Sequence, residues 1–215
     1  MLRQNLVEQL KNGKVGIMPT DTIYGIVGSA LRPATVRRIY RLRRRNPKKP
    51  MIILIGAVDD LAQFGVFLPS SRSASGRRVK KVLNRVWPGK VSVILPISPR
   101  RISRARGASD PSAETFLTKF SYLHRGTGTL AFRLPRPRWL RSLLCETGPL
   151  VAPSANFEGE PSARTVGEAR KYFAEKVDFY RDGGNLDSAP STIIKINNGK
   201  SMILRGNKTQ SVLKF

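Results

Sequence analysis

The sequence predicts one α/β domain, residues 1–215, in which helices flank a mixed β-sheet. Two observations support this fold class: short apolar runs rich in β-branched residues recur along the whole chain, and helical patterns lie between several of them. A third is the turn Asn197-Asn198-Gly199-Lys200 between two short strand-like runs, which indicates a terminal antiparallel hairpin. The sheet is therefore expected to be mixed and not purely parallel.

The predicted elements alternate along the chain. The expected strands are VGIM (15–18), MIILIG (51–56), VSVILPI (91–97), GTLAFRLP (128–135), LVAPSA (150–155), STIIKI (191–196) and SMILRG (201–206). Helical spacing of apolar residues predicts helices at about 2–12, 33–45, 58–67, 76–86, 136–146 and 165–175. Two polar segments, 69–78 and 97–116, are expected to be exposed, partly mobile surface loops. Neither has the character of a domain linker, so we expect a single domain.

The composition bounds the class of protein. A chain of 215 residues with 40% hydrophobic residues can bury a full core. The single cysteine, Cys145, allows no internal disulfide and favours a reducing compartment. The N-terminal segment lacks the apolar core of a signal peptide, and no apolar run approaches the roughly 20 residues of a membrane span. We therefore expect a cytoplasmic protein with no membrane contact.

The charge is strongly positive. Thirty-nine Lys and Arg residues against 14 Asp and Glu residues give a formal net charge of +25. Such a field attracts nucleic acid, nucleotides and other polyanions. A general bias toward arginine would give the same excess, so the charge alone identifies no partner.

Several common kinds of site are absent from the sequence. His124 is the only histidine and is distant in the chain from Cys145, which excludes a Cys/His zinc site and a histidine-based serine triad. Neither a GxxxxGK[ST] phosphate loop nor a GxGxxG fingerprint is present. Any nucleotide must therefore bind by another geometry.

Polar side chains gather at the ends of the predicted strands. Pro19-Thr20-Asp21-Thr22 follows the first strand, Pro153-Ser154-Ala155-Asn156 follows another, Ser191 precedes a third, and Thr129 and Arg133 lie within 128–135. In open α/β sheets, ligands collect at strand ends, where hydroxyls, backbone N–H groups and arginine hold carboxylates and phosphates. Each motif taken alone is more typical of a turn or a helix cap than of a binding site. Arginine within an apolar run is different, because a buried guanidinium needs an anionic partner.

These residues, in this order, resemble the YrdC/TsaC family of L-threonylcarbamoyladenylate synthases. The family pattern PT[DE]TxYG matches Pro19–Gly25, and the family's Lys-x-Arg before a Pro and an apolar strand matches Arg43-Arg44-Arg45 and KKPMIILI. The remaining blocks are WPGKVSVILP (87–96), Thr129–Pro135, APSANFEGEPS (152–162), Asp182-Gly183-Gly184 with Ser191-Thr192, and LRGN (204–207). Because the blocks span nearly the whole chain, the resemblance is specific. It implies a single YrdC-like domain with a twisted sheet and a large basic cavity.

The resemblance also implies a reaction. L-Threonine, bicarbonate and ATP, usually with Mg²⁺, would give threonylcarbamoyl-AMP and pyrophosphate. The product would feed the tRNA threonylcarbamoyltransferase machinery, which modifies adenosine beside the anticodon of certain tRNAs. The implied partners are therefore the three substrates, transient contact with that machinery, and tRNA or other RNA. No covalent enzyme nucleophile is needed, so catalysis would come from positioning and charge neutralisation.

By the same resemblance, site residues can be assigned. Arg43, Arg45 and Arg133 are expected to be catalytic. Thr20, Arg133, Ser154 and Ser191 would hold threonine and its carbamate, with Arg133 on the carboxylate. The ATP site would be formed by Arg43, Arg45, Thr129, Ala152 (through its backbone), Asn156, Ser162 and Arg205. No side chain is assigned to a metal, because Mg²⁺ would be bound through the ATP phosphates. Asp21 and Thr22 are expected to cap the turn.

The basic run 37–49 divides into two groups. Arg43 and Arg45 are expected to face the cavity, and the others to stay solvated: Arg37, Arg38, Arg41, Arg44, Lys48 and Lys49. Arg43 stands where the family usually has Lys, which puts the ATP contact in question because arginine forks differently. Asn46 replaces a frequent Pro and Pro190 a usual Glu. Glu158 replaces a frequent Ser and is expected to point outward.

Two other classes of protein fit the same scaffold. The first is a non-catalytic protein that binds tRNA or double-stranded RNA, which the net charge favours, although the 7% aromatic content and the lack of an RRM-type motif do not. The second is the similar carbamoyl-transfer domain of hydrogenase-maturation proteins. Those are long chains with zinc-type Cys motifs, which a chain with one cysteine cannot supply.

Overall fold

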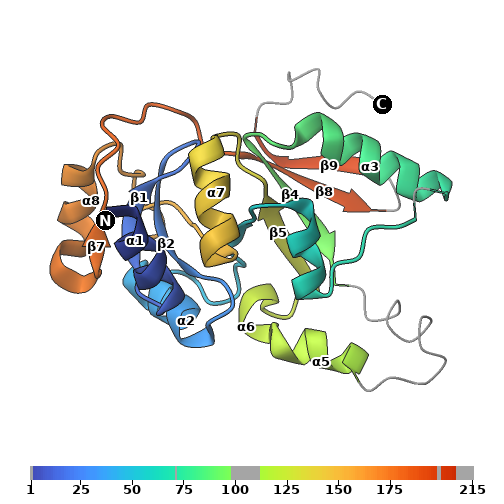
Figure 1. The fold of residues 1–215 in the computed structure, drawn as a ribbon, viewed down its shortest axis with the longest axis horizontal. Helices are drawn as coiled ribbons and strands as arrows, with labels where there is room; N and C mark the ends of the chain where they lie inside the picture. Colours follow the sequence, from blue (N-terminus) through green and yellow to red (C-terminus); the bar gives the residue numbers. More distant parts are fainter. Residues whose placement is uncertain (1, 71, 98–111, 198–199, 207–215) are drawn as a thin grey trace.

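The described part of the chain is built on one mixed sheet. The computed structural model describes residues 2–70, 72–97, 112–197 and 200–206, and within these ranges nine strands are ordered β7-β1-β2-β6-β3-β5-β4-β8-β9 (Figure 1). The sheet contains both antiparallel pairs, such as β1–β2 and β4–β5, and parallel pairs, such as β3–β5 and β4–β8. The predicted α/β fold with a mixed sheet is therefore confirmed.

The elements have the following bounds. The strands are β1 (Gly16–Pro19), β2 (Tyr24–Ser29), β3 (Ile52–Leu54), β4 (Val91–Pro96), β5 (Thr129–Arg133), β6 (Leu150–Val151), β7 (Phe179–Tyr180), β8 (Thr192–Asn197) and β9 (Lys200–Arg205). The helices are α1 (Leu2–Lys11), α2 (Pro33–Leu42), α3 (Ala74–Val86), α5 (Ser112–Lys119), α6 (Ser121–His124), α7 (Arg138–Thr147) and α8 (Val166–Phe173), with short 3₁₀ helices at Val58–Phe64 and Ala174–Lys176. None of the helices described is long and apolar enough to cross a membrane.

Two strands, β2 and β7, and two helices, α5 and α6, were not expected from the sequence. All six residues of β2 are buried, and Gly25 and Gly28 interrupt its apolar pattern, so it has neither the alternation nor the continuous β-branched run of a typical strand. β7 has only two residues, and α6 has four. Elements this short carry too few residues for a periodic pattern to identify them.

Two predicted loops are partly helical. α3 begins at Ala74, inside the expected 69–78 loop, because the Ser73 side chain accepts a hydrogen bond from Gly76 N–H and caps the helix. α5 begins at Ser112, so the expected loop 97–116 is wrong from residue 112 onward. Residues 98–111 of that loop, residue 71 of the other, and the hairpin turn residues 198–199 lie outside the described residues.

Two helices are also shorter than expected. The helix predicted at 58–67 is a 3₁₀ helix that ends at Phe64, where Gly65 adopts the left-handed conformation with φ 71°. α2 ends at Leu42, so Arg43 caps the helix and Arg45 lies outside it. At this early end Arg43 is buried and Arg45 is partly buried, whereas Arg44 between them is exposed.

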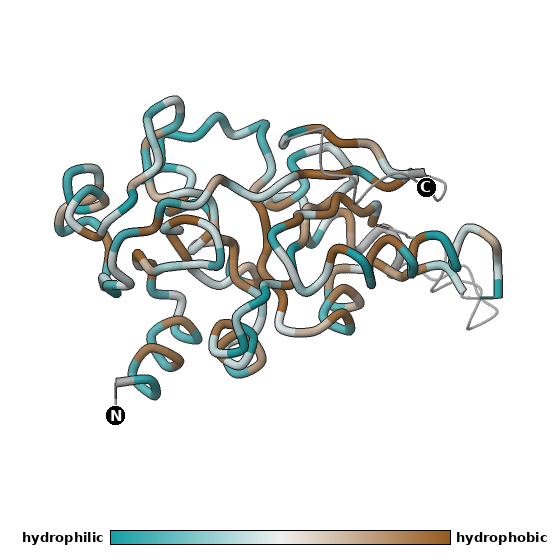
Figure 2. Tube along the Cα trace, turned by 90° about the horizontal axis from the view of Figure 1, so that it is seen from above, coloured by the Kyte–Doolittle hydropathy of each residue, from teal (hydrophilic) through white to brown (hydrophobic). Residues whose placement is uncertain are grey.

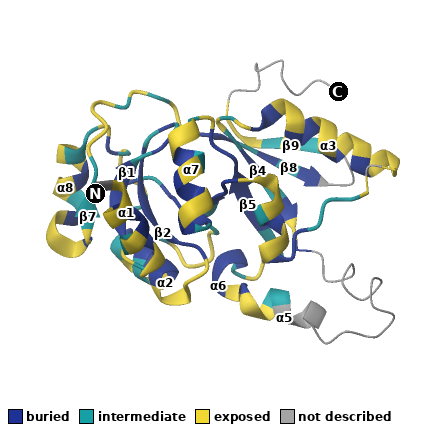
Figure 3. Cartoon of the chain, in the orientation of Figure 1, coloured by how far each residue is buried: buried dark blue, intermediate teal, exposed yellow. Residues whose placement is uncertain are grey.

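Alternating strand residues build two apolar clusters, one on each face of the sheet. Met18, Val27 and Leu54 pack with side chains of α1 and α7, whereas their neighbours Ile17 and Ile26 belong to the larger cluster. The larger cluster also contains buried residues of α2, α3, α6 and α8. Figure 2 shows hydrophobic segments gathered in the middle of the molecule and coiled turns that change between hydrophilic and hydrophobic. Figure 3 shows helices with a buried side and an exposed side.

The same alternation places the last residue of β5. Leu130 and Phe132 belong to the larger cluster, so Ala131 and Arg133 point to the opposite face. On that face, Ala131 and Arg133 border a cavity instead of a helix. The end of β5 therefore places an arginine at the wall of this cavity.

Candidate functional site

A cavity of about 370 Å³ lies over the ends of the central strands. Ten of the eleven side chains or backbone positions predicted for the site line it: Thr20, Arg43, Arg45, Thr129, Arg133, Ala152, Ser154, Ser162, Ser191 and Arg205. They come from segments up to 185 positions apart (20 to 205) in the sequence. None of the described side chains that line the cavity is a carboxylate, so its wall is strongly cationic.

The sheet brings these residues together at strand ends. Thr20 follows β1, Arg133 ends β5, Ser191 precedes β8, and Arg205 ends β9. Ser154 follows β6 and forms an antiparallel bridge with Gly25 of β2. The position of each side chain is therefore set by backbone pairing and not by a flexible loop alone.

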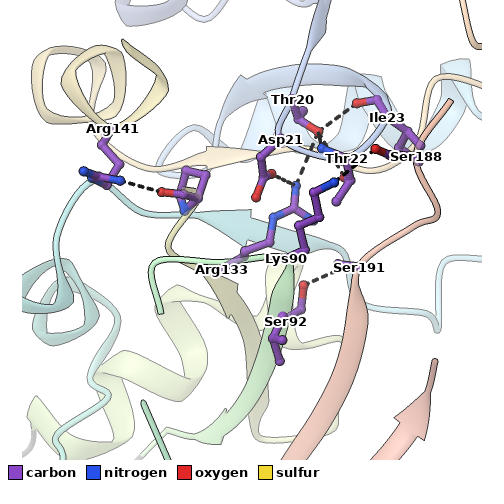
Figure 4. Close-up of polar contacts among 12 residues, drawn as sticks. Thr20, Asp21, Thr22, Ile23, Lys90, Ser92, Arg133, Arg141, Ser188 and Ser191 are labelled. Atoms are coloured by element: carbon purple, nitrogen blue, oxygen red, sulfur yellow. Dashed lines mark hydrogen bonds and ion pairs between the residues drawn. The ribbon is translucent and has the colours of Figure 1, made fainter. Parts of the chain in front are cut away.

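The Thr20–Ile23 turn differs from its prediction. Thr20, expected to offer its hydroxyl only to a substrate, makes the turn: its Oγ1 accepts from Thr22 N–H at 3.2 Å and donates to the Ile23 carbonyl at 2.7 Å. Asp21, expected to cap the turn, instead points to Arg133 (Figure 4). The prediction assigned the capping bonds to the wrong side chain, because an acid and a hydroxyl are equally good caps and only the position of Arg133 distinguishes them.

Arg133 and Asp21 form a buried ion pair. Arg133 Nη2 lies 3.0 Å from Asp21 Oδ1, and the two side chains are 4% and 2% exposed. Arg133 Nη2 also lies 3.5 Å from Thr20 Oγ1. Burial lowers the pKa of Arg133, and the charge of Asp21 opposes that shift. The acid therefore favours the guanidinium form of a residue that has almost no contact with solvent.

Arg43 braces the loop that carries Ser154. Its Nε donates to the Asn156 carbonyl at 3.1 Å, and its Nη2 donates to Ser154 Oγ at 3.1 Å and to Asn156 Oδ1 at 3.0 Å. Burial and the nearby charge of Arg45 lower the pKa of Arg43 to about 10. Arg43 thus joins the C-terminal end of α2 to the 152–163 segment while it faces the cavity.

Asn156 is the one predicted site residue that does not line the cavity. Its Nδ2 donates to the carbonyls of Phe157 and Glu160 at 2.7 Å and 2.6 Å, and its Oδ1 accepts from Arg43. Every polar atom of the side chain is therefore used within the protein. In this structure Asn156 supports Arg43 from behind the cavity wall.

Most residues of the basic run 37–49 face the cavity or the solvent as predicted. Arg43 and Arg45 line the cavity, whereas Arg37, Arg41 and Lys48 are exposed. Arg44 is exposed and stacks over the Phe157 ring at 4.2 Å.

Two residues expected to be solvated also have carboxylate partners. Arg38 pairs with Asp178, and Lys49 Nζ lies 2.6 Å from Glu158 Oε1. Glu158 also accepts from Asn46 N–H, and these two hydrogen bonds lower its pKa. Glu158 is absent from the cavity wall, in agreement with the expected outward orientation.

Ser92 was missed by the sequence reasoning. It is fully buried on β4, and its Oγ lies 3.0 Å from Ser191 Oγ (Figure 4). The signal was present, because a hydroxyl inside the apolar run VSVILP is unusual for a core strand. Ser92 fixes the hydroxyl of Ser191 at the cavity wall.

A network around Tyr24 anchors the segment before Ser191. Tyr24 Oη donates to the Gly184 carbonyl at 2.8 Å and accepts from Gly183 N–H at 2.7 Å. A Cβ at Gly183 would lie 2.7 Å from the Pro19 side chain, so no larger residue fits there. The motif Asp182-Gly183-Gly184 therefore ties the approach to β8 onto the end of β1.

The structure offers little for metal or histidine chemistry. Among the described residues, no three His, Cys, Asp or Glu side chains come together to hold a metal ion. His124 is buried and structural: its Nε2 donates to the Leu117 carbonyl at 2.8 Å, and its Nδ1 accepts from Gly126 N–H. The groups available to a ligand are hydroxyls, guanidinium groups and backbone amides.

Comparisons with known proteins agree with this architecture. The family model Sua5_yciO_yrdC, described as telomere recombination, matches residues 8–206. The chain is 30% identical over 201 residues to a putative threonylcarbamoyl-AMP synthase of Methanocaldococcus jannaschii, covering 93% of this chain and 83% of the relative. It is 33% identical over 184 residues to the threonylcarbamoyl-AMP synthase of Idiomarina loihiensis, covering 84% and 87%.

A solved structure extends the comparison. The Pyrococcus abyssi Sua5 protein complexed with L-threonine superposes with a TM-score of 0.73 at 26% identity, covering 94% of this chain. This chain spans 53% of the length of that protein. The match therefore concerns one part of a longer relative.

Proposed function

This chain belongs to the Sua5/YciO/YrdC family, and we propose that it is a threonylcarbamoyl-AMP synthase. The reaction would join L-threonine, bicarbonate and ATP into threonylcarbamoyl-AMP with release of pyrophosphate. The observation that carries the proposal is a single cationic cavity lined by four arginines, Arg43, Arg45, Arg133 and Arg205. Arg133 is paired with Asp21 behind the cavity wall, whereas Arg43, Arg45 and Arg205 form no ion pair with the described residues. We therefore assign the end of the cavity at Arg133 to the amino acid and the end at the other three arginines to the nucleotide.

The end at Arg133 suits an amino acid. Its guanidinium would bind the threonine carboxylate, as the residue type is well matched to a planar carboxylate. Thr20, Ser154 and Ser191 surround it with hydroxyl groups at the cavity wall. These would orient the amino acid and its carbamate.

The other end suits a nucleotide triphosphate. Arg43, Arg45 and Arg205 would neutralise phosphate charge, and Thr129 and Ser162 would add hydroxyl donors. Asn156 would act through Arg43, whose side chain it holds. The backbone at Ala152 and the adjoining cavity wall would contact the nucleoside. Mg²⁺ would enter on the phosphates as part of the ATP substrate.

The proposed chemistry needs no covalent enzyme intermediate. The threonine amine attacks the bicarbonate carbon and water leaves, which gives the carbamate. A carbamate oxygen then forms a bond to the α-phosphorus of ATP while the bond between that phosphorus and the α–β bridging oxygen breaks. The chain contributes alignment of the two substrates and fixed positive charge where negative charge develops.

The product sets its own requirements. Threonylcarbamoyl-AMP is a mixed anhydride that water hydrolyses, so a transferase must take it up soon after release. We propose transient contact with the tRNA threonylcarbamoyltransferase machinery and a cytoplasmic location, where tRNA is modified.

Substrate omission tests the proposal directly. Purified protein with Mg²⁺ and ATP should release pyrophosphate only when L-threonine and bicarbonate are both present. Release that is indifferent to threonine would contradict the proposal. Replacement of L-threonine by D-threonine is a matched control, because it keeps every functional group and changes only the geometry.

A second candidate function is RNA binding, with or without the synthase activity. Arg37, Arg41 and Arg44 form an exposed ridge on and after α2, and none of them has a carboxylate partner in the described part of the chain. A ridge of exposed cations without carboxylate partners favours a phosphate backbone. The test is tRNA binding at several salt concentrations with the Arg37→Gln/Arg41→Gln variant, which should reduce the salt dependence. Tight tRNA binding by protein that releases no pyrophosphate would favour the non-catalytic alternative.

A further inference from the structure

The ion pair behind the cavity wall has unused hydrogen-bonding capacity. Neither oxygen of Asp21 receives an aligned hydrogen bond, and Arg133 Nε has no partner either, although all three atoms are buried. The two groups are held by charge contact at 3.0 Å. Native proteins rarely leave several polar atoms unpaired in one place without a functional reason.

Stability is a poor explanation for this pair. Removing two charges from water costs several kcal/mol for each ion, and apolar residues of similar volume are often as good or better for stability. An apolar neighbour is at hand, since Leu54 of β3 is the cross-strand partner of Arg133 and belongs to an apolar cluster. A reason for Asp21 must therefore be sought in what Arg133 does.

Arg133 and its partner Asp21 together carry a different net charge from Arg45 and Arg205 with their partners. Arg205 Nη2 donates to the Ser191 carbonyl, and the Nε and Nη2 of Arg45 donate to the Lys49 and Pro50 carbonyls. Neutral carbonyls leave both arginines with a full positive charge. The Arg133–Asp21 pair is formally neutral.

We infer that Asp21 is a positioning and specificity residue that reserves Arg133 for the amino acid. This inference rests on the proposed synthase function. Asp21 fixes one edge of the guanidinium and cancels its charge at a distance, so a polyphosphate gains little by approaching that end. A planar carboxylate still gains directional hydrogen bonds from the guanidinium. The negative charge of Asp21 also favours the positively charged ammonium group of a free amino acid.

The consequence is separation of two anionic substrates within one cavity. Triphosphate is drawn to Arg43, Arg45 and Arg205, none of which forms an ion pair in the described part of the chain. The nearby acid Glu158 acts on Arg43 and Arg45 from outside the cavity wall and is itself paired with Lys49. The threonine carboxylate is left with Arg133. Without Asp21, both anions would compete for Arg133. We therefore expect polyphosphate to compete with threonine in a variant without Asp21, and not in wild type.

The experiment measures threonine binding with and without a polyphosphate. L-Threonine is titrated by calorimetry into wild type, Asp21→Asn and Asp21→Glu, each alone and with saturating tripolyphosphate. Asp21→Asn keeps the size and removes the charge, and we expect threonine affinity to fall by about tenfold or more. Tripolyphosphate should weaken it further in this variant only. Asp21→Glu retains the acid that the family pattern also accepts, and should restore affinity to within about threefold of wild type.

The matched control is Asp59→Asn. Asp59 is exposed on the 3₁₀ helix at Val58–Phe64, so the change removes the same charge from the chain without touching the cavity. Its threonine affinity should equal that of wild type. ATP affinity should stay within about twofold in all variants, since the phosphate end is unchanged.

Three outcomes would overturn the inference. They are unchanged threonine affinity in Asp21→Asn, an equal loss in Asp59→Asn, and displacement of threonine by tripolyphosphate in wild type. The wild-type measurement needs no variant, so the inference stays testable even if Asp21→Asn does not fold. Failure of the proposed function is distinguishable, because wild type would then release no pyrophosphate in the presence of threonine and bicarbonate.

Discussion

Replacing Arg43 by lysine tests whether the forked guanidinium holds the cavity wall. Arg43 donates hydrogen bonds at 3.0–3.1 Å to Ser154 Oγ and to two oxygens of Asn156. A lysine ammonium keeps the charge but reaches only one of these acceptors from the same position. Two hydrogen bonds from a charged donor are lost, each at the lower end of about 1.5–3 kcal/mol because cavity water can replace part of each. The free energy of unfolding should fall by about 3 kcal/mol.

The assay is thermal unfolding of Arg43→Lys beside Arg44→Lys. For a chain of this size, about 3 kcal/mol corresponds to a Tm decrease of about 6–12 °C. Arg44→Lys makes the same chemical change one residue away at an exposed position, and should leave Tm within about 2 °C. A Tm for Arg43→Lys that matches wild type, or an equal decrease in Arg44→Lys, would refute the bracing role. Pyrophosphate release by Arg43→Lys should persist, since phosphate charge is still neutralised.

Three further changes test other parts of the structure. Ser92→Ala frees the Ser191 hydroxyl and should raise KM for threonine several-fold with KM for ATP unchanged, measured by pyrophosphate release. Tyr122→Phe removes the hydrogen bond to the Ala30 carbonyl and about 1 kcal/mol of stability. Burial raises the pKa of Tyr122 to about 12. The stability that the protonated Tyr122 contributes is therefore complete below the ordinary tyrosine pKa of about 10 and is lost as the pH rises toward 12. Denaturant unfolding of wild type and Tyr122→Phe at pH 9 and 11 measures this loss. For Asp178, burial raises the pKa, but hydrogen bonds from Val15 N–H and Arg38 outweigh it and hold the pKa below its usual value. The stability gap between wild type and Asp178→Asn should therefore close as the pH falls below about 4, which acid titration of unfolding would show.

Much of the fold could be predicted because its strands carry strong local patterns. The runs at 51–56, 91–97 and 128–135 are apolar over most of their length, and all became central strands. β2 was not predicted because glycines interrupt its apolar pattern. These glycines are needed where the chain passes close to neighbouring segments. The helical start at Ser112 was hidden because its residues share the polar composition of the segment before it.

The site was harder to predict than the fold because its contacts join distant segments. The polar strand ends identified the cavity wall correctly, including Thr20, Ser154 and Arg205. The sequence could not show that Asp21 lies against Arg133, 112 positions away, since that contact depends on the sheet order and not on spacing. For the same reason Asn156 was assigned to ATP, although the polar atoms of its side chain form hydrogen bonds within the protein.

The most direct measurement is the fate of labelled bicarbonate. Protein incubated with ATP, Mg²⁺, L-threonine and ¹³C-bicarbonate should form an adenylate whose mass includes one threonine and one ¹³C atom, with pyrophosphate formed in equal amount. No ¹³C-labelled adenylate should form when threonine is omitted. Pyrophosphate release without such an adenylate, or no turnover under these conditions, would contradict the assignment of the cavity to this reaction.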